Sequence, residues 1–187
     1  MENKKQRILD TTLKLITERG FHDTPMSLVA KEAGVAAGTI YHYFDSKEEL
    51  ISELYSSLKA KMGEVLVEKE SNSKSIKDRF FRFWENLYRF FLSHPQEFKF
   101  LEQYANSPLV DKGVREENKS HYQGILNFME EGMQVGVLRP MPVLLMANLV
   151  YGHIVNTAKL QLNQEFDIQA DLLQQVIQSS WDGVRIN

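Results

Sequence analysis

The chain has 187 residues, of which 43% are hydrophobic and 25% charged, with a net charge of −3 and no cysteine. This composition is typical of a soluble globular protein and excludes a disordered chain, and the missing cysteine excludes disulfides, thiolate metal sites and cysteine nucleophiles. The length fits one compact unit or a small head joined to a larger body, since domains mostly contain about 100 to 150 residues.

The first predicted helix spans Lys4 to Arg19. Apolar residues at helical spacing form its buried side: Ile8, Leu9, Leu13, Leu15 and Ile16. Gly20 is expected to end the helix in the left-handed conformation, and Phe21 follows where a Schellman motif places a hydrophobic contact.

A second, shorter helix is predicted from Met26 to Ala33. Thr24 stands where an N-cap is expected, and Pro25 stands at the first helical position, which proline favours. Gly34 closes this helix, so a tight glycine turn is expected before the next one.

A third helix is predicted after this turn, ending at Phe44. At 100° per residue, one side holds the residues that are expected to face inward: Ala37, Ile40, Tyr41 and Phe44. The opposite, outward side holds Ala36, Gly38, Thr39, His42 and Tyr43.

A helix-turn-helix supported by a first helix is the arrangement in which the second helix of the pair enters the major groove of DNA. Residues 1–47 carry a balance of +1 and the rest −4, so any DNA-binding surface is expected to be local and small.

A capping box predicts the start of a fourth helix, with Ser46 capping its first turn and Glu49 reaching back. The apolar residues of this helix lie along one side, which is expected to pack and to link head and body: Leu50, Ile51, Leu54, Tyr55, Leu58 and Met62. The polar residues 68–75 that follow are predicted to form a loop.

The aromatic segment from Phe80 to Ser93 predicts a central helix. Apolar side chains cover roughly 200° of its circumference, whereas a surface helix needs a stripe of about 100°. These side chains are Phe80, Phe81, Phe83, Trp84, Leu87, Tyr88, Phe90, Phe91 and Leu92. His94 and Pro95 are expected to break the helix, and residues 97–104 to form a shorter one.

Further helices are predicted at about residues 113–134, 141–162 and 167–183, so the whole chain is predicted to be all-α. The last two have clear apolar faces, which predict a four-helix dimer interface with a second copy. The candidate interface residues are Leu145, Met146, Leu149, Val150, Ile154, Leu173, Val176, Ile177 and Trp181. The alternative is that these residues complete the core of a single chain.

The segment TPMSLVAKEAGVAAGTIYHYFDSKEEL, residues 24–50, closely resembles the signature of the TetR/AcrR family of bacterial regulators. The ordered runs AKEAGV, GTIYHYF and SKEEL carry the resemblance, which covers about a quarter of the chain. It implies a DNA-binding head, assigned here to residues 1–46, and a helical bundle for dimerisation and ligand sensing over residues 47–187.

The resemblance also implies which residues of the head contact DNA. The helix over Gly38 to Phe44 would read the groove, and Lys47 would contact phosphate. The full set of candidate DNA-binding residues is Ser27, Ala36, Gly38, Thr39, Tyr41, His42, Tyr43 and Lys47. Ala36 departs from the family pattern, because many members have serine or threonine there, able to cap the helix or to touch phosphate. Core packing is the expected role of Ile40 and Phe44.

In the body, many members of this family bind small apolar or amphipathic molecules among the middle helices. The aromatic surplus is compatible with such a pocket, since ligand sites are mostly apolar with a few polar groups. The candidate lining residues are Phe83, Trp84, Tyr88, Phe98, Tyr104, Tyr122, Phe128 and Met129. The alternative is that these residues are ordinary core.

The function implied is that of a ligand-responsive transcriptional repressor that binds a double-stranded, palindromic DNA operator as a homodimer, with a small apolar or amphipathic effector. The alternative is an architectural or division-control DNA binder without an effector. No cofactor or metal is expected, and the chain carries none of the common catalytic motifs, so an enzyme is not expected. The polar opening MENKKQRILD and the lack of a run of about 20 apolar residues predict a cytoplasmic protein that makes no membrane contact.

Overall fold

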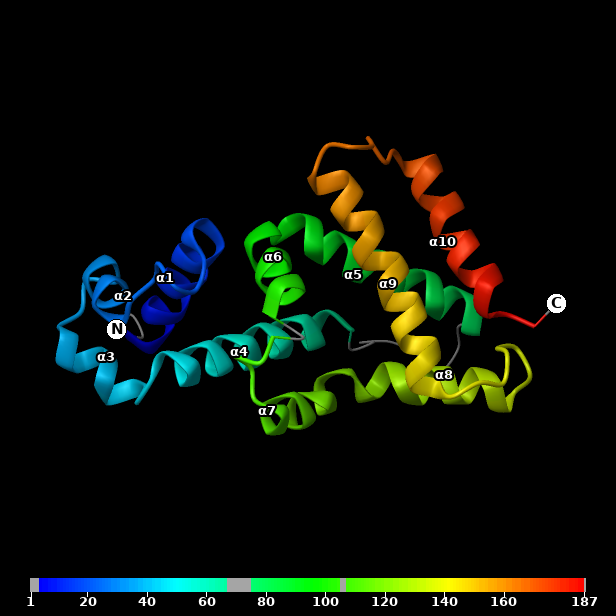
Figure 1. Ribbon diagram of the computed structural model, residues 1–187. Helices are drawn as coiled ribbons and strands as arrows, with labels where there is room; N and C mark the ends of the chain where they lie inside the picture. Colours follow the sequence, from blue (N-terminus) through cyan, green and yellow to red (C-terminus); the bar gives the residue numbers. More distant parts are fainter. Residues whose placement is uncertain (1–3, 67–74, 105–106, 187) are drawn as a thin grey trace. The chain divides into compact units, whose positions relative to one another are not determined.

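The structure is a computed structural model that describes residues 4–66, 75–104 and 107–186 (Figure 1). The described residues form helices without a β-sheet, which confirms the predicted all-α class. They divide into two compact units. The head unit comprises the chain up to Ala60 together with residues 94–118, and the body unit comprises residues 61–93 together with those from Lys119 onward. The predicted loop over residues 68–75 lies outside the described residues, apart from Ser75.

The head unit is built from a trihelical cluster and the segments that pack beside it. Its helices are α1 (Lys4–Arg19), α2 (Met26–Glu32), α3 (Ala37–Tyr43), most of α4 (Lys47–Leu66), α6 (Pro95–Tyr104) and α7 (Lys112–Glu117). The predicted apolar side of α1 is buried, as is the predicted apolar side of α4. The backbones of Gly20 and Gly34 have φ angles of +84° and +63°, so both turns use the left-handed conformation that glycine tolerates best.

The start of α2 differs from the prediction at Thr24. Its hydroxyl donates to the Gly20 carbonyl at 2.8 Å, and Pro25 occupies the N-cap position. Thr24 therefore closes the turn after α1 instead of capping α2, because its side chain is fully buried and points back to the end of α1.

The predicted capping box at the start of α4 is present with one shift. The Ser46 hydroxyl accepts from the Glu49 amide at 3.1 Å, as expected. The Glu49 carboxylate accepts from the amide of Asp45 at 2.5 Å, one residue before the N-cap. The box still satisfies amide groups at the start of the helix, where no intrahelical partner exists.

Helix α6 belongs to the head unit although it lies far from α1 in the sequence. Its Lys99 ammonium donates to the Thr17 carbonyl at 2.5 Å, near the C-terminus of α1. The Tyr104 hydroxyl forms a hydrogen bond with the backbone of Phe21, just beyond the same helix end. The head unit defined by packing thus contains more than residues 1–46. The assignment of DNA binding to residues 1–46, and of dimerisation and ligand sensing to residues 47–187, stays a prediction.

Lys59 is a buried lysine on α4, with a side chain that is about nine-tenths covered. Its ammonium lies 5.6 Å from the centre of the Tyr55 ring, and burial lowers its pKa from 10.5 to about 8. A lysine whose pKa is lower in the folded state destabilises the fold at any pH below about 8, and this cost disappears as the pH rises from 8 towards 10.5.

We therefore expect Lys59→Met to raise the free energy of unfolding at pH 7 by about 1 to 3 kcal/mol. Urea denaturation at pH 7 and at pH 10 measures the effect, and the gain should shrink at the higher pH. Lys112→Met, at an exposed position of α7, is the control and should change stability little. A loss of stability in Lys59→Met at pH 7 would show that the contacts of the ammonium, including that with the Tyr55 ring, outweigh the cost of its burial.

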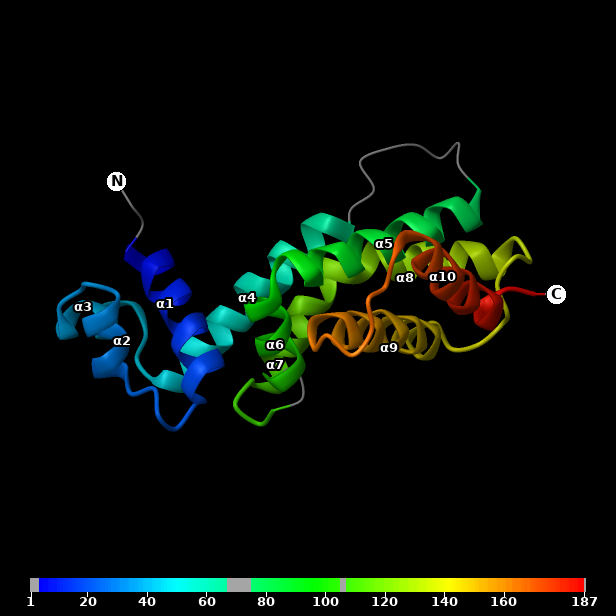
Figure 2. The same ribbon diagram turned by 90° about the horizontal axis from the view of Figure 1, so that it is seen from above.

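The body unit is organised around α5 (Ile76–Ser93), which packs on both α9 (Val143–Leu162) and α10 (Ala170–Val184). The remaining helix, α8 (Gln123–Gln134), packs on α9. Figures 1 and 2 both show α9 and α10 side by side. On α5, the Phe80 ring lies 5.2 Å from the Trp181 ring and the Phe91 ring 6.2 Å from the Tyr151 ring. These contacts confirm the predicted central position of the aromatic helix.

Most predicted helix boundaries differ from the structure by one to three residues, and two predictions of helix extent differ by more. Helix α5 begins at Ile76 and not at Phe80, because the Ser75 hydroxyl caps it by accepting from the Asp78 amide at 3.1 Å. The single helix predicted over residues 113–134 is instead α7, a 3-10 turn over Asn118–Tyr122, and α8. At this break the buried Asn118 amide donates to the Val114 carbonyl and to the Ser56 hydroxyl, and asparagine side chains that bind backbone compete with helical hydrogen bonding.

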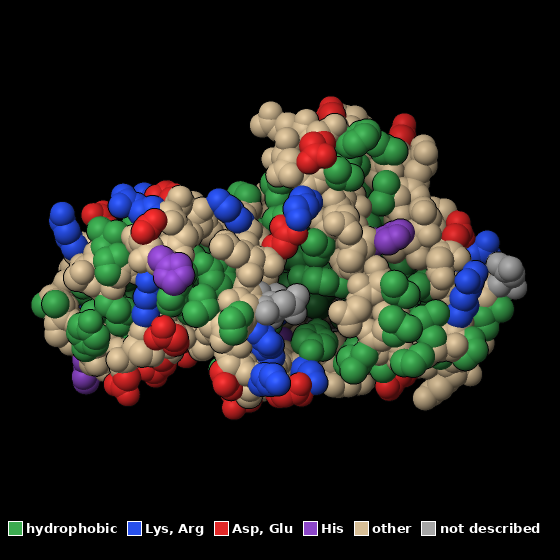
Figure 3. Space-filling view, in the orientation of Figure 1, with side chains coloured by type: hydrophobic (Ala, Val, Ile, Leu, Met, Phe, Trp, Pro, Cys, Tyr) green, Lys and Arg blue, Asp and Glu red, His purple; other side chains and the backbone are tan. Residues whose placement is uncertain are grey.

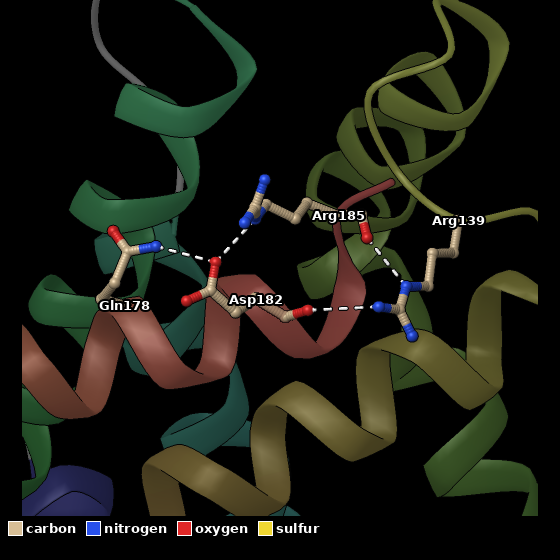
Figure 4. A network of polar contacts seen from close by, with 4 residues as sticks. All are labelled: Arg139, Gln178, Asp182 and Arg185. Atoms are coloured by element: carbon tan, nitrogen blue, oxygen red, sulfur yellow. Dashed lines mark hydrogen bonds and ion pairs between the residues drawn. The ribbon is translucent and has the colours of Figure 1, made fainter. Parts of the chain in front are cut away.

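A polar network joins the end of α10 to the connection between α8 and α9 (Figure 4). Arg139 donates to the Arg185 carbonyl at 2.7 Å, and Asp182 accepts from Gln178 at 2.9 Å and from Arg185 at 2.6 Å. Hydrogen bonds from Gln178 and Arg185 hold the pKa of the Asp182 carboxyl below its usual value. None of the helices in the described part of the chain is long and apolar enough to cross a membrane.

Candidate nucleic-acid interface

Helix α3 is held to the head unit by few side chains and leaves most of its surface exposed. Ile40 is its only buried residue, and Phe44, the next residue after the helix, is buried as well. Ala37 and Tyr41 were predicted to face inward, and this was wrong: Ala37 is exposed and Tyr41 is 55% exposed. The buried side of the helix is a single residue, Ile40, and the buried Phe44 follows it in extended backbone geometry.

The exposed surface of α3 combines hydrogen-bonding side chains with bare backbone. Gly38, His42 and Tyr43 are exposed and Thr39 is half-buried, as the outward-facing prediction requires. The His42 and Tyr43 rings meet edge to face with their centroids 5.4 Å apart. A Cβ atom added at Gly38 would have no described neighbour within 4 Å, so the chain itself leaves room there for an approaching molecule.

Two further candidates border this surface. Ser27 is exposed in the first turn of α2, and Ala36 is exposed at the N-cap position of α3. Alanine has no side-chain oxygen, so the Ala36 side chain leaves the first amides of α3 uncapped, in line with the departure noted in the sequence. Uncapped amides at a helix start are hydrogen-bond donors for an external acceptor such as a phosphate oxygen.

Lys47 is engaged inside the head unit. Its ammonium donates to the Phe21 carbonyl and lies 3.9 Å from the centre of the Phe21 ring, a cation–π distance. Burial lowers the pKa of Lys47, and the charges of Glu48 and Asp23 partly offset this effect. An ammonium has three donors, so this contact leaves capacity for a phosphate oxygen.

Sequence reasoning missed the second role of Phe21. It was expected only as a hydrophobic contact after α1, yet its carbonyl binds Lys47 of α4 and its backbone binds Tyr104 of α6. The turn after α1 is thereby linked to both α4 and α6. No short motif predicts such a contact, because the partners are separated from Phe21 by dozens of residues.

The candidate dimer residues fall into two groups in the body unit. Leu145 and Leu149 are more than half exposed, and Val176 is half-buried. The remaining candidates are in the core of the unit: Met146, Val150, Ile154, Leu173, Ile177 and Trp181. Their side chains are buried within a single chain, as the core alternative predicts. The surface over α9 shows apolar side chains in Figure 3.

The candidate pocket residues are divided between the two units. Phe98 and Tyr104 are buried in the head unit, whereas the other candidates belong to the body unit: Phe83, Trp84, Tyr88, Tyr122, Phe128 and Met129. Neither unit by itself brings all of them together. The body unit also has an open groove of about 590 Å³ along α10, which sequence reasoning missed and which is lined by Phe81, Gln174, Gln175, Gln178, Ser179 and Asp182.

Comparison with known proteins identifies both parts of the chain. Residues 8–54 match the model of bacterial regulatory proteins of the tetR family, and residues 75–185 match a tetracyclin repressor-like C-terminal domain. An HTH-type transcriptional regulator of Haemophilus influenzae, itself uncharacterized, is 26% identical over 180 residues, which cover 96% of this chain and 95% of that protein.

Solved structures show the same fold. The crystal structure of a TetR-family transcription regulator from Shewanella sp. PV-4 superposes with a TM-score of 0.91 and 27% identity, covering all of both chains. The transcriptional regulator FadR from Bacillus subtilis, solved in complex with stearoyl-CoA, superposes with a TM-score of 0.75 and 24% identity over 95% of this chain and 98% of that one. The relatives are regulators and not enzymes, and the chain itself belongs to the TetR family of bacterial DNA-binding transcription regulators.

Proposed function

We propose that this chain is a ligand-responsive repressor that acts in the cytoplasm as a homodimer on a palindromic DNA operator. The observation that carries the proposal is the exposed face of α3, a short helix held by Ile40 and Phe44 and otherwise open to a partner. A helix of this kind in a helix-turn-helix enters the major groove, and a dimer places its two reading helices about 34 Å apart, or a multiple of one DNA turn.

Within this interface, different side chains have different roles. Thr39, His42 and Tyr43 carry hydroxyl and imidazole groups that can bind base edges, which gives sequence specificity. Ser27, Tyr41 and Lys47 contact phosphates and set the position of the head on the duplex. Gly38 and Ala36 contribute by being small, since they let the start of α3 approach the DNA backbone.

The dimer forms through the outward faces of α9 and α10. Two rows with the same spacing of four, three and four residues lie on these faces. On α9 the row is Leu145, Leu149, Gly152 and Asn156, and on α10 it is Leu172, Val176, Ser179 and Gly183. Exposed leucines bury apolar surface against a second copy, and the glycines and serine let helices come close. These rows replace the buried candidates as the proposed interface.

A small apolar or amphipathic effector controls DNA binding in this proposal. Support comes from the aromatic body unit and from the likeness to FadR, whose structure contains stearoyl-CoA. An effector releases DNA only if it binds the non-binding conformation more tightly, with a coupling of typically about 1 to 3 kcal/mol. The bonds of Lys99 and Tyr104 to the end of α1 tie the position of α1 to that of α6.

Binding-site selection from random duplex DNA tests the proposal. We expect inverted repeats among the selected sites and two chains, or a multiple of two, on each site by native mass spectrometry. Selected sites without symmetry, bound by single chains, would contradict it. Titrating effectors against the complex separates the repressor from an architectural DNA binder, because the latter would keep its affinity in the presence of every ligand that binds.

Lys47→Ala is expected to weaken binding to specific and random DNA alike. If Lys47 neutralises one phosphate, the slope of log affinity against log salt concentration should fall by about one. Fluorescence anisotropy at several salt concentrations measures it. Lys112→Ala, which removes the same charge from α7, is the control and should leave the slope unchanged. An unchanged slope in Lys47→Ala would mean that this ammonium serves only the Phe21 contact.

A further inference from the structure

Two polar atoms in the core of the body unit have no hydrogen-bond partner among the described residues. They are the indole nitrogen of Trp84 and the hydroxyl of Tyr88, and both side chains are at most 2% exposed. An unsatisfied buried donor costs on the order of 1 to 3 kcal/mol, so few survive in native proteins without a reason. The buried hydroxyl of Thr157 on α9, by contrast, donates to the His153 carbonyl at 2.7 Å.

The two atoms lie on the same side of α5. Trp84 and Tyr88 are four residues apart, which places them on successive turns of one helix face, and their ring centroids are 5.7 Å apart. The neighbouring members of this face, Phe80 and Phe91, meet rings of α10 and α9. The pair therefore lies where α5 packs on both helices, inside one compact unit.

Both groups act as donors. The indole N–H can only donate, and burial raises the pKa of the Tyr88 hydroxyl, which keeps its proton. What the pair lacks is an acceptor oxygen. Neither an apolar molecule nor a cation would supply one.

The surroundings favour a neutral acceptor over an anionic one. The buried polar side chains described in the body unit are Thr157 and Ser180, and neither is basic. The half-buried Arg82 of α5 lies on the opposite side of the helix from Trp84, because the two residues are two positions apart. The guanidinium of Arg89, on the exposed side of α5, is engaged by Glu85 at 2.6 Å. A carboxylate or phosphate would therefore be buried without a counter-ion, at a cost far above that of a neutral carbonyl.

We propose that Trp84 and Tyr88 form the polar anchor of a ligand site between α5, α9 and α10, for a hydrophobic molecule with a neutral carbonyl group, such as an ester or a ketone. The carbonyl oxygen accepts from the indole N–H and from the phenol O–H, and the rest of the molecule packs among the aromatic side chains. The inference rests on the proposed effector response and names the chemical class of the effector.

Methyl decanoate, sodium decanoate and decane serve as probes with the same chain length. They represent a neutral carbonyl compound, an anion and a purely apolar molecule. The indole N–H signals of the ¹⁵N-labelled full-length protein report on the two tryptophans, Trp84 and Trp181, which a Trp181→Phe variant assigns. We expect methyl decanoate to move the Trp84 signal downfield and to leave that of Trp181 nearly unchanged. Decanoate should bind at least tenfold more weakly, and decane should produce no downfield shift.

Tyr88→Phe provides an independent reading. It should weaken methyl decanoate binding about tenfold, the scale of one hydrogen bond to a buried carbonyl. It should also raise the melting temperature of the ligand-free protein by about 2 to 4 °C, because it removes an unsatisfied buried hydroxyl. Thr157→Val deletes a buried hydroxyl of the same unit that already has a partner, the His153 carbonyl, and should leave the affinity unchanged without raising the melting temperature.

Several results would overturn the inference. If all three probes leave the Trp84 signal unchanged and Tyr88→Phe lowers the melting temperature, the pair holds an ordered water only. Preferential binding of decanoate, or equal binding of decane, would refute the neutral carbonyl. Operator affinity measured on the same samples distinguishes this inference from the proposed function. If the protein binds DNA but no probe shifts the Trp84 signal, only the ligand site is refuted. Ester binding that leaves operator affinity unchanged supports the site and refutes the effector mechanism.

Discussion

Replacing Gly38 with glutamate is expected to abolish specific DNA binding without harming the fold. A Cβ atom at this position meets no described atom of the chain within 4 Å, so the larger side chain causes no internal clash. Glutamate also favours helix more than glycine does, and a carboxylate in the first turn of a helix is favourable. On DNA, however, the same side chain fills the space that the duplex must enter and brings a negative charge against phosphates.

We expect the affinity of Gly38→Glu for the selected operator to fall by about 100-fold or more, since like charges brought together at an interface cost several kcal/mol. Anisotropy titration measures the loss, and thermal unfolding confirms that the fold is intact. Gly124→Glu is a matched control, because Gly124 is also the second residue of its helix, is exposed, and has no described atom within 4 Å of an added Cβ. Equal affinity in both variants would remove the start of α3 from the interface.

Replacing Gly152 with glutamate is expected to split the dimer into folded monomers. Gly152 lies in the middle of α9, in the row with Leu145 and Leu149, and an added Cβ would again have no described neighbour within 4 Å. Within one chain the change should be neutral or stabilising, because glycine inside a helix costs about 0.5 to 1 kcal/mol relative to alanine. In the dimer it places a charge in an apolar contact and keeps the helices apart.

The dissociation constant of the dimer should rise by about 100-fold or more in Gly152→Glu, the scale of several kcal/mol for an unpaired buried charge. Sedimentation at micromolar concentration reads the mass directly, with Gly124→Glu again as the control. Binding to a full palindrome should fall with dimerisation, while binding to a single half-site should persist because α3 is untouched. A variant that stays dimeric would place the interface on another surface.

Local signals in the sequence determined the head of this protein well. The bounds of α1 were predicted as observed, and Gly20 and Gly34 adopt the left-handed turns expected of them. The burial of Ile40 and the exposure of His42 and Tyr43 on α3 followed from helical spacing alone. These features depend on residues within a few positions of one another, and such interactions leave a readable pattern in one sequence.

Contacts between distant segments decided the rest. Only the tertiary structure shows that α6 docks on α1 through Lys99, that Lys47 binds Phe21, and that the Asn118 side chain accompanies a break in a long predicted helix. The apolar residues of α9 and α10 were recognised, but an amphipathic pattern does not say which of its leucines a neighbouring helix will cover. The packing of α5 decides this, because α5 covers one side of α9 and one side of α10 and leaves Leu145 and Leu149 exposed. Segments far apart in the chain pack together where their side chains have complementary shapes. A local pattern in one sequence contains no information about that complementarity.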